Sequence, residues 1–226
     1  MASSDPSDDH VLGLTVHSLP APQDLDPSAT RSGRWKMFLV LLLCAAPVVA
    51  SYVTYYFVRP QARQNFGTLI EPQRPLPDMP VRDLAGTNSN LRALKGQWLL
   101  ISVAGGACDA LCQKHLYLQR QLREGLGKEK DRLDWVWLVT DEAPVPAALT
   151  PALATATVLR LPEAQLQTWL QADAGLALPN HLYLVDPLGN WMMRFPPGTD
   201  LNQAPKIKRD LERLLRASAF WDTPGR

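Results

Sequence analysis

The stretch Leu94–Cys112, LKGQWLLISVAGGACDALC, links a strand, a loop and a helix. A Lys-Gly turn precedes a continuous apolar run that ends at Val103, which is the pattern of a strand covered on both faces. Leucines then recur at helical spacing over residues 111–126, which predicts an amphipathic helix. Cys108 and Cys112 therefore stand where a buried strand gives way to a helix.

Two thiols four residues apart allow three uses. On a helix, positions i and i+4 lie on the same face one turn apart, so both sulfurs point the same way. A purely structural disulfide would close a very short loop and contribute roughly 2 kcal/mol, less than a long-range bridge. Redox exchange and binding of a soft metal are the other two uses, and both remain open at this point.

Each of these two uses assigns a role to the cysteines. In exchange, the Cys108 thiolate attacks a partner disulfide and Cys112 resolves the mixed disulfide. A helix N-terminus would lower the pKa of Cys108, whereas the charge of Asp109 would raise it, so the net direction stays open. In metal binding, two thiolates and one imidazole suit Cu(I). His115 and His181 are the candidate imidazoles.

The remaining pattern predicts an α/β domain. A second strand with apolar residues at nearly every position follows the helix, as expected for a parallel βαβ unit. After it come a short strand, a helix, a β-hairpin and a final amphipathic helix. The expected ranges are Trp135–Thr140, Val158–Leu161, Pro162–Gln171, His181–Val185 with Trp191–Phe195, and Pro205–Ala217.

An uncharged apolar run, Met37–Val58, is long enough to cross a hydrocarbon core of about 30 Å as a helix. It is longer than the apolar part of a signal peptide and begins far from the N-terminus, so we interpret it as an uncleaved anchor. Three basic residues precede it closely and two follow, which favours a cytoplasmic N-terminus. We expect a single-pass protein of the inner (cytoplasmic) membrane with a periplasmic C-terminal domain.

The expected organisation has five parts. Prolines after the apolar run predict an extended linker, and a Ser-, Asp- and Pro-rich start predicts a solvated tail. The parts are a cytoplasmic tail at 1–34, the transmembrane helix at 35–58, the linker at 59–80, the domain at 81–218 and a tail at 219–226.

Composition narrows the function classes. The 23 basic and 22 acidic residues nearly cancel, which argues against a nucleic-acid partner. Three cysteines are too few for a disulfide scaffold, and Cys44 lies inside the apolar run, where we interpret it as an apolar filler.

The order of elements resembles the thioredoxin fold, and within it the SCO/SenC family of membrane-anchored copper proteins of cytochrome c oxidase assembly. Four segments and the single N-terminal anchor carry the resemblance. The segments are Leu94–Leu100, Cys108–Cys112 with its C-x-x-x-C spacing, Val136–Asp141, and Tyr183–Gly189. The resemblance implies a central mixed sheet flanked by helices, behind a transmembrane helix.

The chain also departs from that family. Asp109 replaces a proline, and an ungapped match places Leu178 where the family has its copper-binding histidine. His181 lies three residues further on and is the imidazole that we prefer as third ligand. Leu178-Pro179-Asn180 instead resembles the loop of TlpA-like oxidoreductases, whose proline is cis and touches the dithiol.

Three functions follow as expectations. The first is an SCO-like protein that binds copper through Cys108, Cys112 and His181, or maintains copper-site thiols. Its partner would be a cytochrome c oxidase subunit or another assembly factor. The second is a TlpA-like thiol-disulfide oxidoreductase with Cys108, Cys112 and Pro179 as catalytic residues. The third is a scaffold with a vestigial dithiol.

Overall fold

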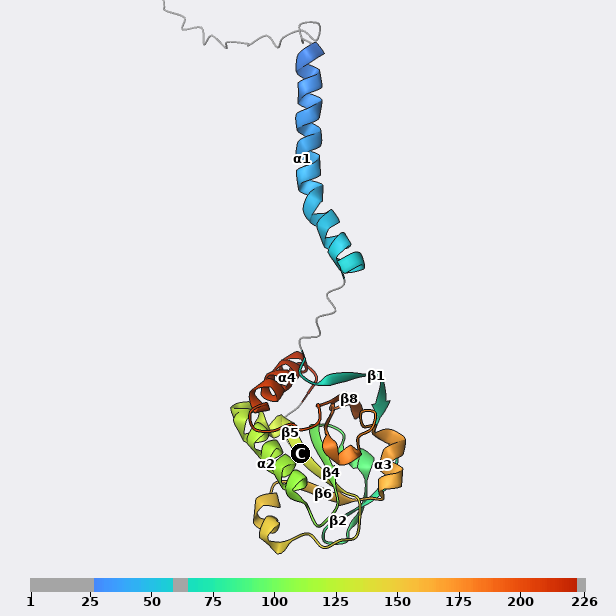
Figure 1. Ribbon diagram of the computed structural model, residues 1–226. Helices are drawn as coiled ribbons and strands as arrows, with labels where there is room; N and C mark the ends of the chain where they lie inside the picture. The colour runs from blue at the N-terminus through green and yellow to red at the C-terminus, as the bar shows by residue number, and fades with distance from the viewer. Residues whose placement is uncertain (1–26, 59–64, 223–226) are drawn as a thin grey trace, which may run out of the picture. The chain divides into compact units, whose positions relative to one another are not determined.

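The computed structural model describes residues 27–58 and 65–222. The chain divides into two compact units, residues 1–63 and residues 64–226 (Figure 1). Most of the tail expected at residues 1–34 lies outside the described residues.

The first unit contains one long helix, as the apolar run predicts. Helix α1 (Pro27–Val53) continues into a short π-helical segment, η2 (Thr54–Val58). Within it, Ser32–Tyr56 has a mean hydropathy of 2.2, and the described side chains are exposed. At 1.5 Å per residue its 25 residues are long enough for a hydrocarbon core of about 30 Å, so the helix is a candidate membrane span by length and composition.

The second unit is built on one mixed sheet with the strand order β1-β8-β7-β4-β5-β6-β2-β3. The strands β4, β5 and β6 run parallel, and the other neighbouring pairs are antiparallel. The strands are β1 (Thr68–Pro75), β2 (Pro80–Asp83), β3 (Asn88–Asn90), β4 (Trp98–Ala104), β5 (Leu133–Val139), β6 (Thr157–Arg160), β7 (Leu182–Val185) and β8 (Asn190–Arg194).

Helices cover both faces of this sheet (Figure 1). The α-helices are α2 (Ala110–Gly125), α3 (Glu163–Trp169) and α4 (Ala204–Ala217), and the 3-10 turns are η3 (Leu91–Leu94), η4 (Gly127–Arg132), η5 (Ala147–Leu153) and η6 (Leu178–Asn180). Side chains alternate along β4: Leu99 and Ile101 share a cluster with α3, whereas Trp98 and Leu100 share one with α2 and α4. This alternation is what a strand buried on both faces requires.

The compact unit begins earlier than the sequence pattern predicted. Residues 59–80 were expected to be a linker, yet β1 forms an edge of the sheet by pairing with β8, with Leu69 opposite Met193. The prolines of β1 fit there because an edge strand pairs on one side only. Leu76, just after β1, is buried in the core.

Residues 219–226 were expected to be a tail, yet the described residues after α4 are fastened to the core through Ser218 and Asp222. The fully buried Asp222 carboxylate accepts hydrogen bonds from Trp98 Nε1 at 2.9 Å and from Ser218 Oγ at 3.1 Å. The Arg132 guanidinium, also buried, donates to the same oxygen at 2.7 Å. This network joins the end of η4, the start of β4 and the turn that follows α4.

We expect Asp222→Ala to lower the free energy of unfolding of residues 64–226 by about 3 kcal/mol, because it leaves a buried guanidinium with fewer partners. Asp131→Ala is the control, since Asp131 is exposed and its ion pair with Arg123 contributes less than about 1 kcal/mol. Urea unfolding of both variants measures the difference. Equal losses would show that the network does not hold the C-terminal end.

Candidate functional site

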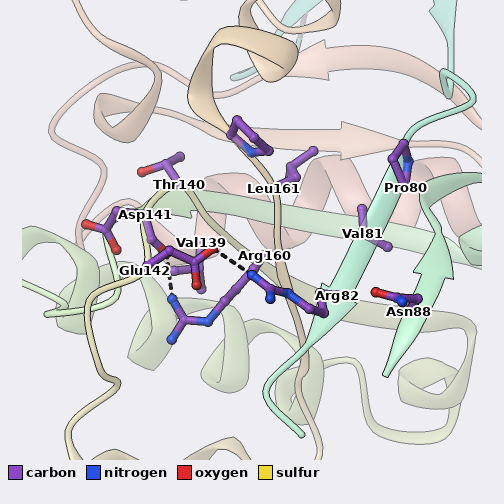
Figure 2. A pocket seen from close by; sticks show the side chains of 11 residues that line it. Pro80, Val81, Arg82, Asn88, Val139, Thr140, Asp141, Glu142, Arg160 and Leu161 are labelled. Atoms are coloured by element: carbon purple, nitrogen blue, oxygen red, sulfur yellow. Dashed lines mark hydrogen bonds and ion pairs between the residues drawn. The ribbon is translucent and has the colours of Figure 1, made fainter. Parts of the chain in front are cut away.

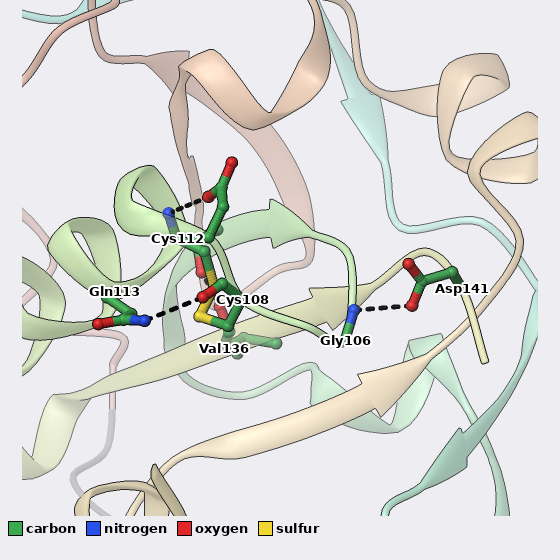
Figure 3. Close-up of a disulfide and its surroundings, with 8 residues drawn as sticks. Gly106, Cys108, Cys112, Gln113, Val136 and Asp141 are labelled. Carbon is green, nitrogen blue, oxygen red and sulfur yellow. Dashed lines mark hydrogen bonds between the residues drawn. A yellow bond between two sulfur atoms is a disulfide. The ribbon is translucent and has the colours of Figure 1, made fainter. Parts of the chain in front are cut away.

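The two cysteines of the sequence motif form a disulfide at the start of α2 (Figure 3). Their Cα atoms are 5.0 Å apart. Asp109 is the N-cap of α2, and its Oδ1 accepts a hydrogen bond from the Cys112 amide at 2.9 Å. Cys108, just before the cap, has a φ of +48°, the left-handed region that residues other than glycine rarely adopt.

The disulfide is shielded from solvent. Cys108 is 2% exposed and Cys112 is 3% exposed. Both belong to an apolar cluster that also contains Trp135 and Trp137 of β5 and Leu153 of η5. Both cysteines are therefore almost completely buried in the structure.

The loop that carries Cys108, residues 105–109, is fastened by hydrogen bonds (Figure 3). The Gly106 amide donates to Asp141 Oδ1 at 2.7 Å, and the Ala143 amide donates to the same oxygen at 3.1 Å. Gln113 Nε2 donates to the Cys108 carbonyl at 3.1 Å. A Cβ at Gly106 would lie 2.1 Å from the Ala143 carbonyl oxygen, so this close approach requires glycine.

A pocket of about 350 Å³ lies at the carboxyl ends of β5 and β6 (Figure 2). Arg160 lines it and donates to the carbonyl oxygens of Asp141 and Ala143, while Arg82 pairs with Glu142 at 2.7 Å. The segment 141–143 thus borders the pocket and also holds the disulfide loop. No periodic pattern in the sequence indicates this contact, and the one signal for it is the position of Asp141, two residues after the end of a parallel strand.

His115, one of the two candidate imidazoles, lies in α2 and is 1% exposed. Its Nε2 has no hydrogen-bond partner. Burial, reinforced by the charge of Lys114 and by His181, lowers the pKa of His115 from 6.5 to about 4. The imidazole is therefore neutral at pH 7.

His181, the preferred third ligand, is fully buried just before β7, and both of its ring nitrogens have partners. With the neutral tautomer that these partners require, Nδ1 donates to the Phe195 carbonyl at 2.9 Å and Nε2 accepts from the Asp173 amide at 3.2 Å. No lone pair remains for a metal in this arrangement. Residues 27–58 and 65–222 contain no cluster of three or more His, Cys, Asp or Glu side chains that could hold a metal ion.

Pro179 lies in η6, which packs against α2 and β4. The resemblance implied a cis peptide bond before Pro179. In the described part of the chain the one cis peptide bond joins Glu71 to Pro72, so the bond before Pro179 is trans. The turn is held by the Tyr183 hydroxyl, which donates to the Leu178 carbonyl at 3.0 Å. Pro179 thus lies on a turn beside the helix that carries the dithiol, and its catalytic role stays a prediction.

Solved structures share the fold at low sequence identity. Apo Sco1 from Thermus thermophilus has a TM-score of 0.52 and 17% identity, over 67% of this chain and 97% of that one. A thiol:disulfide interchange protein from a Bacteroides species gives 0.47 and 16%, over 64% and 90%. ScoI with copper bound, from Bradyrhizobium japonicum, gives 0.45 and 19%, over 61% and 97%. The first likeness supports the thioredoxin-like fold.

No curated protein matches the chain. A family model described as "transmembrane-like, thioredoxin-like, C-terminal domain" matches residues 98–218. That match covers more than half of the 226 residues and includes the disulfide and the helices on both faces of the sheet. The chain therefore belongs to the family of transmembrane-like, thioredoxin-like C-terminal domains.

Proposed function

We propose that the protein is a membrane-anchored thiol-disulfide oxidoreductase in which Cys108 and Cys112 exchange electrons with cysteines of another protein. The observation that carries this proposal is the disulfide between the end of β4 and the first turn of α2, in a thioredoxin-like fold. A bond across four residues constrains the chain little, so a structural purpose explains it poorly.

The exchange balances within the two proteins. When the dithiol is reduced, the Cys108 thiolate attacks a sulfur of the partner disulfide, and the partner's other sulfur leaves as a thiolate. The Cys112 thiolate then attacks Cys108 Sγ and releases the partner's second thiolate. Two electrons pass to the partner, and its two thiolates take up the protons that Cys108 and Cys112 gave up. The reverse sequence oxidises a partner dithiol.

Burial of the disulfide adds a step before exchange. Because both cysteines are at most 3% exposed, a partner reaches Cys108 only when the loop over residues 105–109 opens. The hydrogen bond from Gly106 to Asp141 opposes that opening, since its acceptor is a carboxylate. The exchange rate is then the product of the fraction of open loop and the rate of attack.

We infer the partner and the compartment from the resemblance of the sequence to the SCO/SenC family. The substrate would be the cysteine pair of a copper site in a cytochrome c oxidase subunit, or an assembly factor that carries such a pair. Three basic residues closely precede the apolar run Met37–Val58 and two follow it, which favours the periplasmic side of the inner membrane for the domain.

Copper itself fits this site poorly. Cu(I) held by two thiolates and an imidazole needs a free ring nitrogen, and both nitrogens of His181 are engaged. His115 Nε2 is without a partner, yet the described residues bring no three ligand side chains together. We therefore route no step of the exchange through copper.

Cys112→Ser should trap a mixed disulfide on Cys108, because the resolving thiol is gone while the attacking one remains. Cys108→Ser should trap none, and Cys44→Ser should behave as the parent protein, since Cys44 lies in α1. Non-reducing electrophoresis with mass spectrometry of acid-quenched membranes measures the adducts. Equal yields from the Cys108 and Cys112 variants would contradict the assigned order of attack.

Asp141→Ala should speed reduction of the disulfide by dithiothreitol about tenfold, because a hydrogen bond to a charged group contributes about 1.5–3 kcal/mol to the closed loop. Asp141→Asn, which keeps an acceptor oxygen, should have a smaller effect. Glu142→Ala is the matched control, since Glu142 is the exposed neighbour that pairs with Arg82 instead. Reduction is followed by thiol alkylation over time. Identical rates in all variants would show that Asp141 does not hold the loop of residues 105–109 closed.

His181→Gln should leave the amount of Cu(I) held by the reduced protein unchanged, because the imidazole is committed to backbone groups of Asp173 and Phe195. Competition with a chromophoric Cu(I) chelator measures it, with a folding check by circular dichroism. A folded variant that has lost Cu(I) would restore His181 as the third ligand.

A further inference from the structure

Helix α4 presents a basic face to solvent. Its apolar residues Ile207, Leu211 and Leu215 are buried against the sheet and α2. The exposed residues include one acid, Glu212, which pairs with Lys208 at 3.5 Å. The other exposed charges of the helix are Lys206, Arg209, Arg213 and Arg216. This outer surface therefore has a marked positive charge in a chain whose net charge is only +1.

Two large aromatic side chains follow the basic face directly. Phe220 is 99% exposed and Trp221 is 51% exposed. They belong to an ordered turn in which the Trp221 and Asp222 amides both donate to the Ser218 carbonyl. The buried Asp222 fixes that turn to Arg132 and Trp98. This turn places two exposed aromatic side chains beside the basic face, a combination that suits the interface of a membrane.

The chain enters the domain at the same helix. The Phe66 and Gly67 amides donate to Asp210 Oδ2 at 2.7 and 3.0 Å, and Lys206 Nζ lies 5.5 Å from the Phe66 ring centroid. Six residues, 59–64, separate the end of η2 from Asn65. Because a fully extended chain spans at most about 3.5 Å per residue, this connection can reach roughly 25 Å.

We propose that the basic face of α4, together with Phe220 and Trp221, binds the anionic lipid surface of the membrane that the chain's own helix spans. Lysine and arginine side chains are attracted to anionic headgroups, and aromatic rings favour the interface between headgroups and acyl chains. The surface is a helix face with cations spread along its length. The proposal rests on α1 as a membrane span and is independent of the thiol chemistry.

Docking of this kind does not place lipid over the end of β4 that leads to the disulfide. The turn that carries the aromatic residues is fastened to Trp98, the first residue of β4. The disulfide loop follows Ala104, the last residue of the same strand. The proposed lipid contact and the disulfide thus lie at opposite ends of β4.

The test uses the full chain in nanodiscs of phosphatidylcholine alone, or of phosphatidylcholine with phosphatidylglycerol. Brominated lipids quench the fluorescence of tryptophan side chains in contact with them. The difference in quenching between the parent protein and Trp221→Phe isolates the signal of Trp221 from that of the other tryptophans, including Trp35 in the membrane helix. We expect quenching of Trp221 in the anionic discs at low salt. It should disappear in discs of phosphatidylcholine and in about 1 M salt, where the screening length is about 3 Å.

Two double variants with the same change in charge complete the test. Arg209→Glu with Arg216→Glu should abolish the quenching of Trp221 in anionic discs. Lys114→Glu with Arg120→Glu, on the exposed face of α2, should preserve it. Trp221 that stays unquenched in anionic discs, or that is quenched equally in both kinds of disc, would overturn the proposal. If Trp221 stays unquenched in anionic discs, this surface binds a protein rather than lipid.

Discussion

The parallel pairing of β4 with β5 determines both the core and the site. Its register places Ala104 beside Val139, so both strands end at the same level of the sheet. Gly105 and Gly106 then run next to Asp141, close enough that a Cβ on either glycine would collide with that segment. The crossover through α2 returns the chain across one face, and the cysteines lie at the start of that crossover. A shift of this register would separate the loop from its carboxylate.

Residue pattern alone predicts the elements that are buried on both faces or amphipathic. The apolar runs of β4 and β5 and the leucine spacing of α2 are strong local signals, and the structure has all three elements. The edge strand β1 was missed because its prolines indicate a linker, and only its pairing with β8 makes it a strand. Local pattern cannot supply a partner that lies more than a hundred residues away.

The site was predictable to a smaller extent. The sequence identifies Cys108 and Cys112, since their spacing is local. It does not reveal that His181 is held by Asp173 and Phe195, because those contacts depend on how two loops meet beside β7. Nor does it reveal Asp222, whose burial depends on Arg132, 90 residues earlier in the chain. In each case a polar side chain is fixed by a distant partner that leaves no periodic signal.

The left-handed backbone of Cys108 places conformational strain next to the disulfide. Holding a residue other than glycine at a φ of +48° costs roughly 1–2 kcal/mol, which the closed loop sustains. Any opening that moved Cys108 to a negative φ would relieve this cost, so the backbone strain at Cys108 favours opening of the loop, whereas the hydrogen bond from Gly106 to Asp141 opposes it.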